Sequence, residues 1–268
     1  MSTGIETRPR LRDPAVPLWT VAALCWIAAV TLAVAGGDEL GHHDVVIEHS
    51  ELPWAVRIGA YLSIWTVMIG AMMLPTTVPM ARLVTAVSAR TPDAGPVRTA
   101  LAVAYLAVWA AFGIVALAGD AGVHAAVDRW PWLHEHPGLI LAATLGLAGG
   151  FQFSALKDRC LSACRDPLSM LWRHYRRGPL GAWRLGLRHA LSCLGCCWAL
   201  MLLMFGTGVG SLAWMLLLTA IMVAEKTTRW GRRLSAPAGA VLLVAAALTA
   251  VAAMGFPAPA ADLLGGTA

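Results

Sequence analysis

Five of the six cysteines in this 268-residue chain fall into two short groups. The first group is the pair Cys160 and Cys164, and the second is the sequence Cys193-Leu-Gly-Cys196-Cys197. Residues three or four positions apart share one face of a helix, so each group can point two thiols in the same direction. Deprotonated thiols are ligands for soft metal ions and reactants in thiol–disulfide exchange. The two pairs could converge on one ion, so the spacing favours metal binding or redox chemistry.

Other soft side chains accompany the cysteines. Met201 lies four residues after Cys197 and His189 four residues before Cys193, so one helical face carries histidine, two cysteines and methionine. Met72 and Met73 stand just before Pro75 and Pro79, which we expect to interrupt another apolar segment. Thiolate and thioether ligands favour Cu(I), and thiolates also serve Zn(II) well. The candidate metal ligands are Cys160, Cys164, Cys193, Cys196, Cys197, Met72, Met73, Met201 and Glu225.

Packing is the alternative interpretation of these residues. Methionine in a membrane helix usually fills space, and cysteine behaves as a small apolar residue that lets helices approach. Cys25, which stands apart from both groups, is most simply interpreted in this way.

Three ionisable residues end apolar segments close to the cysteines. Glu225 and Lys226 end one segment, and Lys157 follows another. Adjacent residues do not face each other on a helix, so we expect Glu225 to pair with Lys157 rather than with Lys226. Ionisable groups in such positions are costly to bury and often functional, although a residue at a helix end can also extend to water.

The elements that position these residues are expected to be membrane-spanning helices. The chain is 58% hydrophobic and 13% charged, against about 45–50% and about 25% in soluble domains. Seven segments approach the roughly 20 apolar residues that cross a bilayer. We therefore predict an all-α, polytopic transmembrane bundle with spans near 17–36, 54–74, 98–119, 138–156, 189–206, 211–224 and 235–254.

The first of these segments follows three arginines and resembles a signal peptide in that respect. Its apolar run is longer than the roughly 7–15 residues of a signal sequence, so we assign it as the first span. The expected organisation is one transmembrane domain at 17–254, with a tail of 1–16 before it and a tail of 255–268 after it.

Charge predicts the orientation of the chain. Eighteen of the twenty Lys and Arg residues fall on the same side of the predicted spans as the N-terminus. The positive-inside rule makes that side cytoplasmic and the C-terminus extracytoplasmic, in a multi-pass protein of the cell membrane. The net charge of +5 then reflects topology and contacts with the lipid bilayer, and requires no nucleic-acid partner.

The same orientation puts both cysteine groups on the reducing side, where a structural disulfide framework is not expected. Histidines concentrate on the opposite side. There His42, His43 and His49 share a loop with several acidic residues and could gather a divalent ion.

Four motifs in sequence carry a family resemblance. They are Met68-Ile-Gly-Ala-Met72-Met73-Leu-Pro75, then Lys157-Asp-Arg-Cys160-Leu-Ser-Ala-Cys164-Arg165-Asp-Pro167, then Gly195-Cys196-Cys197-Trp198-Ala-Leu-Met201, and finally Glu225-Lys226. Together they resemble the DUF2182 family of predicted metal-binding integral membrane proteins, some of which are labelled copper chaperones. The resemblance spans about 68–226 and implies a metal-related function without assigning ligand roles. Cys193 lies outside these motifs, so its place in a site rests on geometry alone.

Three functions fit the sequence. The first is binding of a soft metal ion, Cu(I) before Zn(II), for delivery to or from a partner protein. The second is thiol–disulfide exchange across the membrane, for which Cys193-Leu-Gly-Cys196 is the one Cys-x-x-Cys pair. The third is a packing or assembly subunit without chemistry. No nucleotide-binding loop, nucleophilic serine motif or zinc-protease helix occurs in the sequence, and we expect no enzymatic activity.

Overall fold

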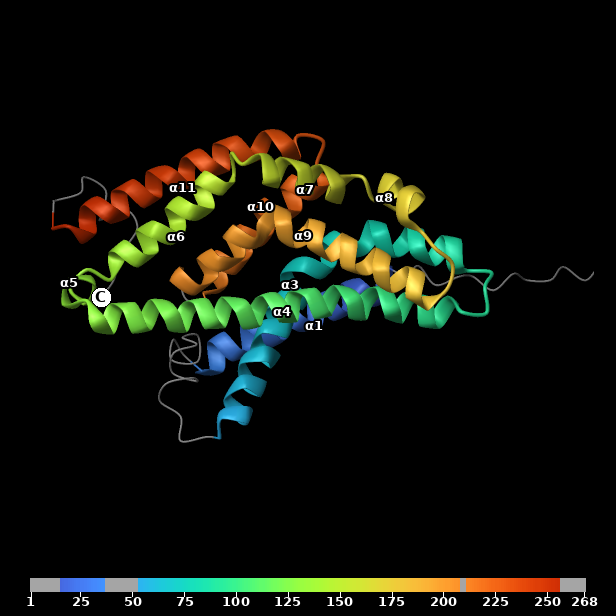
Figure 1. Ribbon diagram of the computed structural model, residues 1–268, viewed down its shortest axis with the longest axis horizontal. Coiled ribbons are helices and arrows are strands. Elements are labelled where there is room, and N and C mark those ends of the chain that lie inside the picture. Colours follow the sequence, from blue (N-terminus) through green and yellow to red (C-terminus); the bar gives the residue numbers. More distant parts are fainter. Residues whose placement is uncertain (1–14, 37–52, 208–210, 256–268) are drawn as a thin grey trace, which may run out of the picture.

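The computed structural model describes residues 15–36, 53–207 and 211–255, and within these ranges the secondary structure is helical without strands (Figure 1). An all-α bundle is thereby confirmed. The helices in chain order are α1 (Ala15–Gly36), α3 (Trp54–Ser88), α4 (Ala94–Arg129), α5 (Pro131–His134), α6 (Gly138–Phe151), α7 (Ala155–Arg165), α8 (Pro167–His174), α9 (Pro179–Thr207), α10 (Leu212–Thr227) and α11 (Gly231–Ala253).

Five of the described helices, α1, α3, α4, α9 and α11, are long and apolar enough to cross a membrane. Helices α6 and α7 meet at a 64° bend and count as a sixth if they form one broken span. The segment predicted as a span at 211–224 forms α10, which has 16 residues and falls short of the roughly 20 that a bilayer requires. By length and composition, the described residues therefore provide five or six spans rather than seven.

Helices α9 and α3 extend beyond the spans that were predicted from the apolar pattern. Helix α9 begins at Pro179, ten residues before the predicted span, because its first turns pack against α4 and α8 inside the protein. Helix α3 continues to Ser88 through the two prolines that were expected to interrupt it.

The prolines redirect α3 without ending it. Pro75 has no N–H to donate to the carbonyl of Ala71, so one helical hydrogen bond is missing there. The indole N–H of Trp26 on α1 donates to that carbonyl instead, at 3.1 Å. The bend of α3 in Figure 1 lies in this region, and Met72 and Met73 lie directly beside it, facing the interior of the bundle.

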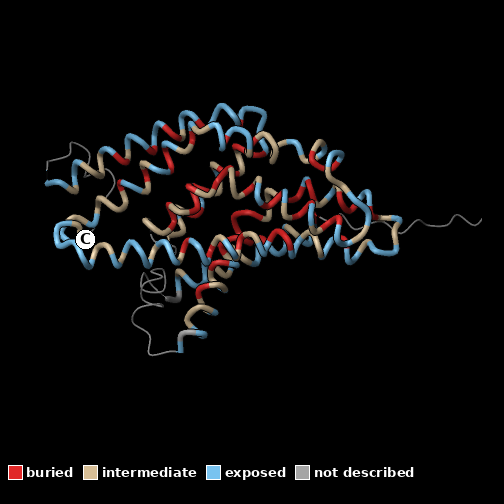
Figure 2. The backbone as a smooth tube through the Cα atoms, viewed as in Figure 1, coloured by how far each residue is buried: buried red, intermediate tan, exposed pale blue. Residues whose placement is uncertain are grey.

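The buried core lies between α3, α9 and α10, whereas α1 and α11 present largely exposed apolar surfaces (Figure 2). Helix α9 packs along α4, α6 packs along α11, and α1 packs along α3. Exposed apolar faces of this kind are what a bilayer would cover. The centre of the bundle is therefore the place where buried polar and sulfur-containing side chains need an explanation.

Candidate metal site

Helix α7 brings the first cysteine pair against the second. Gly195 on α9 makes the close approach possible, since a Cβ at that position would lie 2.5 Å from the Sγ atom of Cys160. One turn further along α7, the Sγ atom of Cys164 lies 4.0 Å from that of Cys196. The predicted convergence of the two cysteine groups is thereby confirmed.

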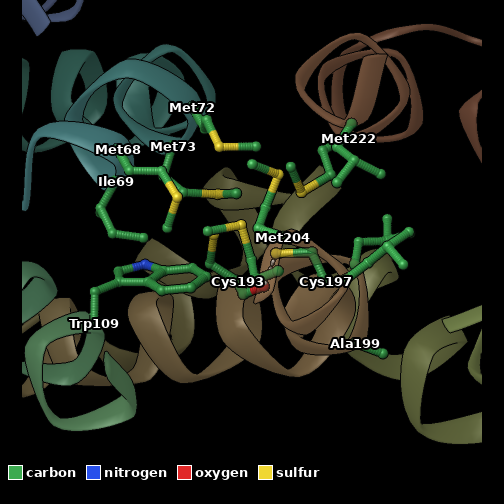
Figure 3. Close-up of a cluster of buried hydrophobic side chains, with 14 of the residues drawn as sticks. Met68, Ile69, Met72, Met73, Trp109, Cys193, Cys197, Ala199, Met204 and Met222 are labelled. Atoms are coloured by element: carbon green, nitrogen blue, oxygen red, sulfur yellow. Dashed lines mark hydrogen bonds between the residues drawn. The ribbon is translucent and has the colours of Figure 1, made fainter. Parts of the chain in front are cut away.

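Sulfur atoms line the interior next to this contact. Figure 3 shows Met72 and Met73 of α3 facing Cys193 and Cys197 of α9 within the buried core cluster. Helix α10 closes the third side. Among the candidate ligands, Cys193, Cys196, Cys197, Met72, Met73 and Met201 are buried, and Cys160 and Cys164 are half-buried.

A lysine ammonium occupies the middle of the sulfur cluster. The Nζ atom of Lys226 lies 3.1 Å from Cys193 Sγ and 3.6 Å from Cys197 Sγ. It also lies 3.7 Å from the Sδ atom of Met73. In the part of the chain that the structure describes, no carboxylate pairs with Lys226. A buried positive charge is costly unless it is compensated, so these sulfur atoms are its compensating partners.

Cys193 is the thiol best placed to carry negative charge. Its Sγ atom is approached by Lys226 and, at 3.2 Å, by the hydroxyl group of Tyr105 on α4. The thiols of Cys196 and Cys197 instead donate to the backbone carbonyl of Cys193, each at 3.0 Å. Donors directed at one sulfur stabilise its thiolate form. The contacts at Cys193 thus suit a thiolate, whereas the thiols of Cys196 and Cys197 donate to the backbone beside it.

The pairing predicted for Glu225 is also confirmed. Its Oε2 atom accepts from Lys157 Nζ at 2.7 Å, and both side chains are almost completely buried. Its Oε1 atom accepts from the hydroxyl group of Ser235 at 3.0 Å. Lys157 also donates to the backbone carbonyl of Cys196 at 3.2 Å, which ties the pair to α9. Both carboxylate oxygens of Glu225 are engaged, so the structure joins this residue to the site through a buried ion pair and not through the sulfur atoms.

Arg165, the last residue of α7, binds the end of α10 close to this ion pair. Its guanidinium group donates to the backbone carbonyls of Glu225 and Thr228, where α10 ends. The carbonyl of Thr228 also accepts from the backbone N–H of Gly231 at 3.1 Å, so the arginine adds to the hydrogen bonding of that helix end.

The potential metal ligands around Lys226 are soft sulfur atoms, and they do not enclose a metal-binding site. In residues 15–36, 53–207 and 211–255, no three side chains of His, Cys, Asp or Glu are arranged to hold a metal. What the interior offers is two thiols around one cation, with a thioether as the third sulfur. An ion that takes Cys193, Cys197 and Met73 must displace the ammonium group and turn the thiol of Cys197 away from the backbone.

Two residues that contact the thiols, Lys226 and Tyr105, were not among the candidate ligands predicted from the sequence. A signal for Lys226 was present, because it follows Glu225 directly and must face another side of α10. His42, His43 and His49, proposed for a second ion site, lie outside the described residues.

One comparison with known proteins gave a match. A family model described as PpoB2, copper chaperone, matches residues 62–249, from within α3 to within α11. No curated protein and no solved structure matches the chain. The match supports the copper-related part of the resemblance seen in the sequence motifs, whereas the narrower DUF2182 assignment stays a prediction.

Proposed function

The chain belongs to the PpoB2 copper chaperone family, and from that premise we propose that it binds one Cu(I) ion through Cys193 and Cys197, assisted by Met73, and passes it to a partner protein. In this proposal copper is cargo, and the protein catalyses no reaction. The observation that carries the proposal is the single ammonium nitrogen held among these three sulfur atoms.

Ligand softness supports Cu(I). Thiolates and thioethers select this ion, and methionine sulfur is a poor ligand for harder ions. Zn(II) sites are commonly closed by four ligands drawn from cysteine, histidine and carboxylates. Around Lys226 the third sulfur belongs to a methionine and the carboxylate of Glu225 is engaged elsewhere, so the local donor set suits Cu(I) better than Zn(II).

Charge balance supports the same choice. Two thiolates and one Cu(I) ion form a complex with a net charge of −1, and Lys226 supplies the single compensating positive charge. With Zn(II), the complex with the same two thiolates would be neutral. The positive charge of Lys226 would then leave the buried group with a net charge of +1. An uncompensated charge in a low-dielectric interior is strongly unfavourable. Lys226 would therefore act as the counterion of the copper complex once its nitrogen has moved aside.

Delivery requires a path by which the ion can leave. Cys164 and Cys196 form a second thiol pair 4.0 Å apart, and Cys164 on α7 is only half-buried. Exchange of Cu(I) from one pair of thiolates to a neighbouring pair proceeds through shared ligands and keeps the ion coordinated throughout. We therefore propose that α7 carries the exit side, where a metal-accepting protein would dock.

The first prediction concerns stoichiometry and pH. Detergent-purified protein, loaded anaerobically and desalted, is expected to retain about one Cu(I) per chain by metal analysis. Because thiols lose their protons on binding, affinity should fall as the pH falls, by about tenfold per pH unit for each proton released. A wild-type protein that takes up no Cu(I) under reducing conditions would contradict the proposed function.

The second prediction concerns the counterion. The Lys226→Met variant is expected to bind Cu(I) at least about tenfold more weakly, a change of ~1.4 kcal/mol, because the anionic complex would be buried without compensation. The Lys226→Arg variant keeps the charge and should bind within a few-fold of the wild type. Both affinities are measured by competition with a Cu(I) chelator of known affinity. Tighter binding by Lys226→Met would instead identify the ammonium group as a competitor of copper.

A further inference from the structure

A large cavity lies beside the thiol cluster, between the first turns of α1, the second half of α3, the first half of α4 and α9. Its volume is about 990 Å³. The walls are mostly apolar, with Arg98 at an exposed position of α4 and Tyr105 and His189 on the side nearest the cysteines. Cavities of this size and character usually receive small organic ligands. A bare metal ion needs far less room.

His189 is buried at this cavity without a hydrogen-bond partner. Its side chain is 4% exposed, and neither ring nitrogen has a partner. The ring packs against that of Tyr105, with 5.8 Å between their centroids. The hydroxyl group of Thr85, in the same cavity wall, is also buried and unpartnered. Unpaired buried polar groups are destabilising, so an imidazole in this state is expected to have a ligand.

The same histidine is adjacent to the proposed copper ligands. His189 lies four residues before Cys193 on α9, so their side chains are neighbours on one face of the helix. Tyr105 joins the two, because its ring contacts the imidazole and its hydroxyl group lies 3.2 Å from Cys193 Sγ. A ligand atom on His189 is therefore one helical turn from the first thiolate.

We infer that this cavity is the loading site, in which His189 takes Cu(I) from a small anionic thiol carrier before the ion reaches Cys193 and Cys197. The inference rests on the proposed function and adds the chemical class of the donor. Imidazole is a suitable copper ligand, and Met80, which is buried in the same wall, offers a thioether. Arg98 favours a carrier with negative charge, and the volume suits a carrier far larger than the ion.

The transfer is a ligand exchange without oxidation or reduction. A bond between copper and the carrier sulfur breaks as a bond to the His189 nitrogen forms. That bond breaks in turn as copper bonds to the Cys193 thiolate and then to Cys197. The carrier thiolate released in the first step stays in the cavity, takes the thiol proton that Cys197 loses on binding copper, and then leaves as the free thiol, while copper stays Cu(I) throughout.

Loading kinetics test the inference. Full-length protein in detergent is mixed anaerobically with Cu(I)–glutathione, and the rise of thiolate-to-copper absorption is followed by stopped flow. His189→Leu removes the ligand, and Ala102→Trp fills the cavity from its α4 wall. The control is Val103→Trp, because Val103 is also exposed on α4 and is not among the residues that line the cavity.

Both test variants are expected to load at least tenfold more slowly than the wild type and to reach the same final copper content, whereas the control loads at the wild-type rate. Loading of either test variant at the wild-type rate would overturn the inference. Failure of the proposed function gives a different result, since the wild type itself would then hold no copper at the end point.

Discussion

Replacing Cys193 and Cys197 together with serine is expected to lower Cu(I) affinity at least about a thousandfold, or ~4 kcal/mol. Serine keeps the approximate size of cysteine but offers a hard oxygen that is hardly acidic, so the soft ion loses both anionic ligands. Lys226 would also lose the sulfur atoms that now lie 3.1 and 3.6 Å from its ammonium group. Chelator competition and metal analysis of the purified variant provide the measurement.

The matched control is Cys25→Ser. Cys25 lies on α1, where its sulfur packs over Gly70 of α3, and it is not among the proposed copper ligands. This variant should bind copper as the wild type does. Loss of membrane insertion or of a folded monodisperse protein in the double variant would support the packing interpretation. A reversible disulfide in the wild type, seen as a gel shift after mild oxidation and without bound metal, would support the redox interpretation.

Breaking the buried ion pair is expected to have the largest effect on stability. Lys157→Met leaves the carboxylate of Glu225 buried with only the hydroxyl group of Ser235 as a hydrogen-bond partner. Removing one member of such a pair typically costs about 3–5 kcal/mol. The hydrogen bond from Lys157 to the Cys196 carbonyl is lost as well. The expected result is a marked fall in the unfolding temperature of the detergent-solubilised protein.

A double variant separates the charge effect from the packing effect. Lys157→Met combined with Glu225→Leu removes both charges, and its stability should lie much closer to that of the wild type than either single change does. Copper stoichiometry of the folded double variant should stay near one, because neither residue contacts the sulfur atoms around Lys226. A single Lys157→Met variant as stable as the wild type would show that the pair contributes little to the fold.

Long-range contacts could be predicted where helical periodicity determines on which side of its helix a residue lies. Glu225 and Lys226 are adjacent and do not face each other on a helix, so Lys157 could be predicted as the partner of Glu225. The meeting of Cys164 with Cys196 followed from two pairs at helical spacing near the same predicted membrane face. Their roles as metal ligands remain a proposal.

Other features could not be predicted from the sequence, because they depend on how the helices pack against each other. Whether Lys226 points to lipid, to water or to sulfur depends on the rotation of α10, which periodicity in a largely apolar helix does not determine. The same holds for the cavity at His189, which four helices form together. The prediction that the prolines interrupt α3 gave them too much weight. A neighbouring helix can supply the hydrogen-bond donor that a proline lacks, as the indole of Trp26 does for the carbonyl of Ala71.

The bond from Trp26 to the Ala71 carbonyl bears on how the protein is made. Helix α1 leaves the ribosome before α3, so the indole is already in the bilayer when the interrupted helix arrives. A backbone carbonyl without a partner at that depth would cost several kcal/mol. A first helix that was cut away after insertion, as a cleaved leader is, would leave this carbonyl bare beside the two methionines. We therefore expect the first helix to be retained in the mature protein, where its indole would keep this carbonyl hydrogen-bonded.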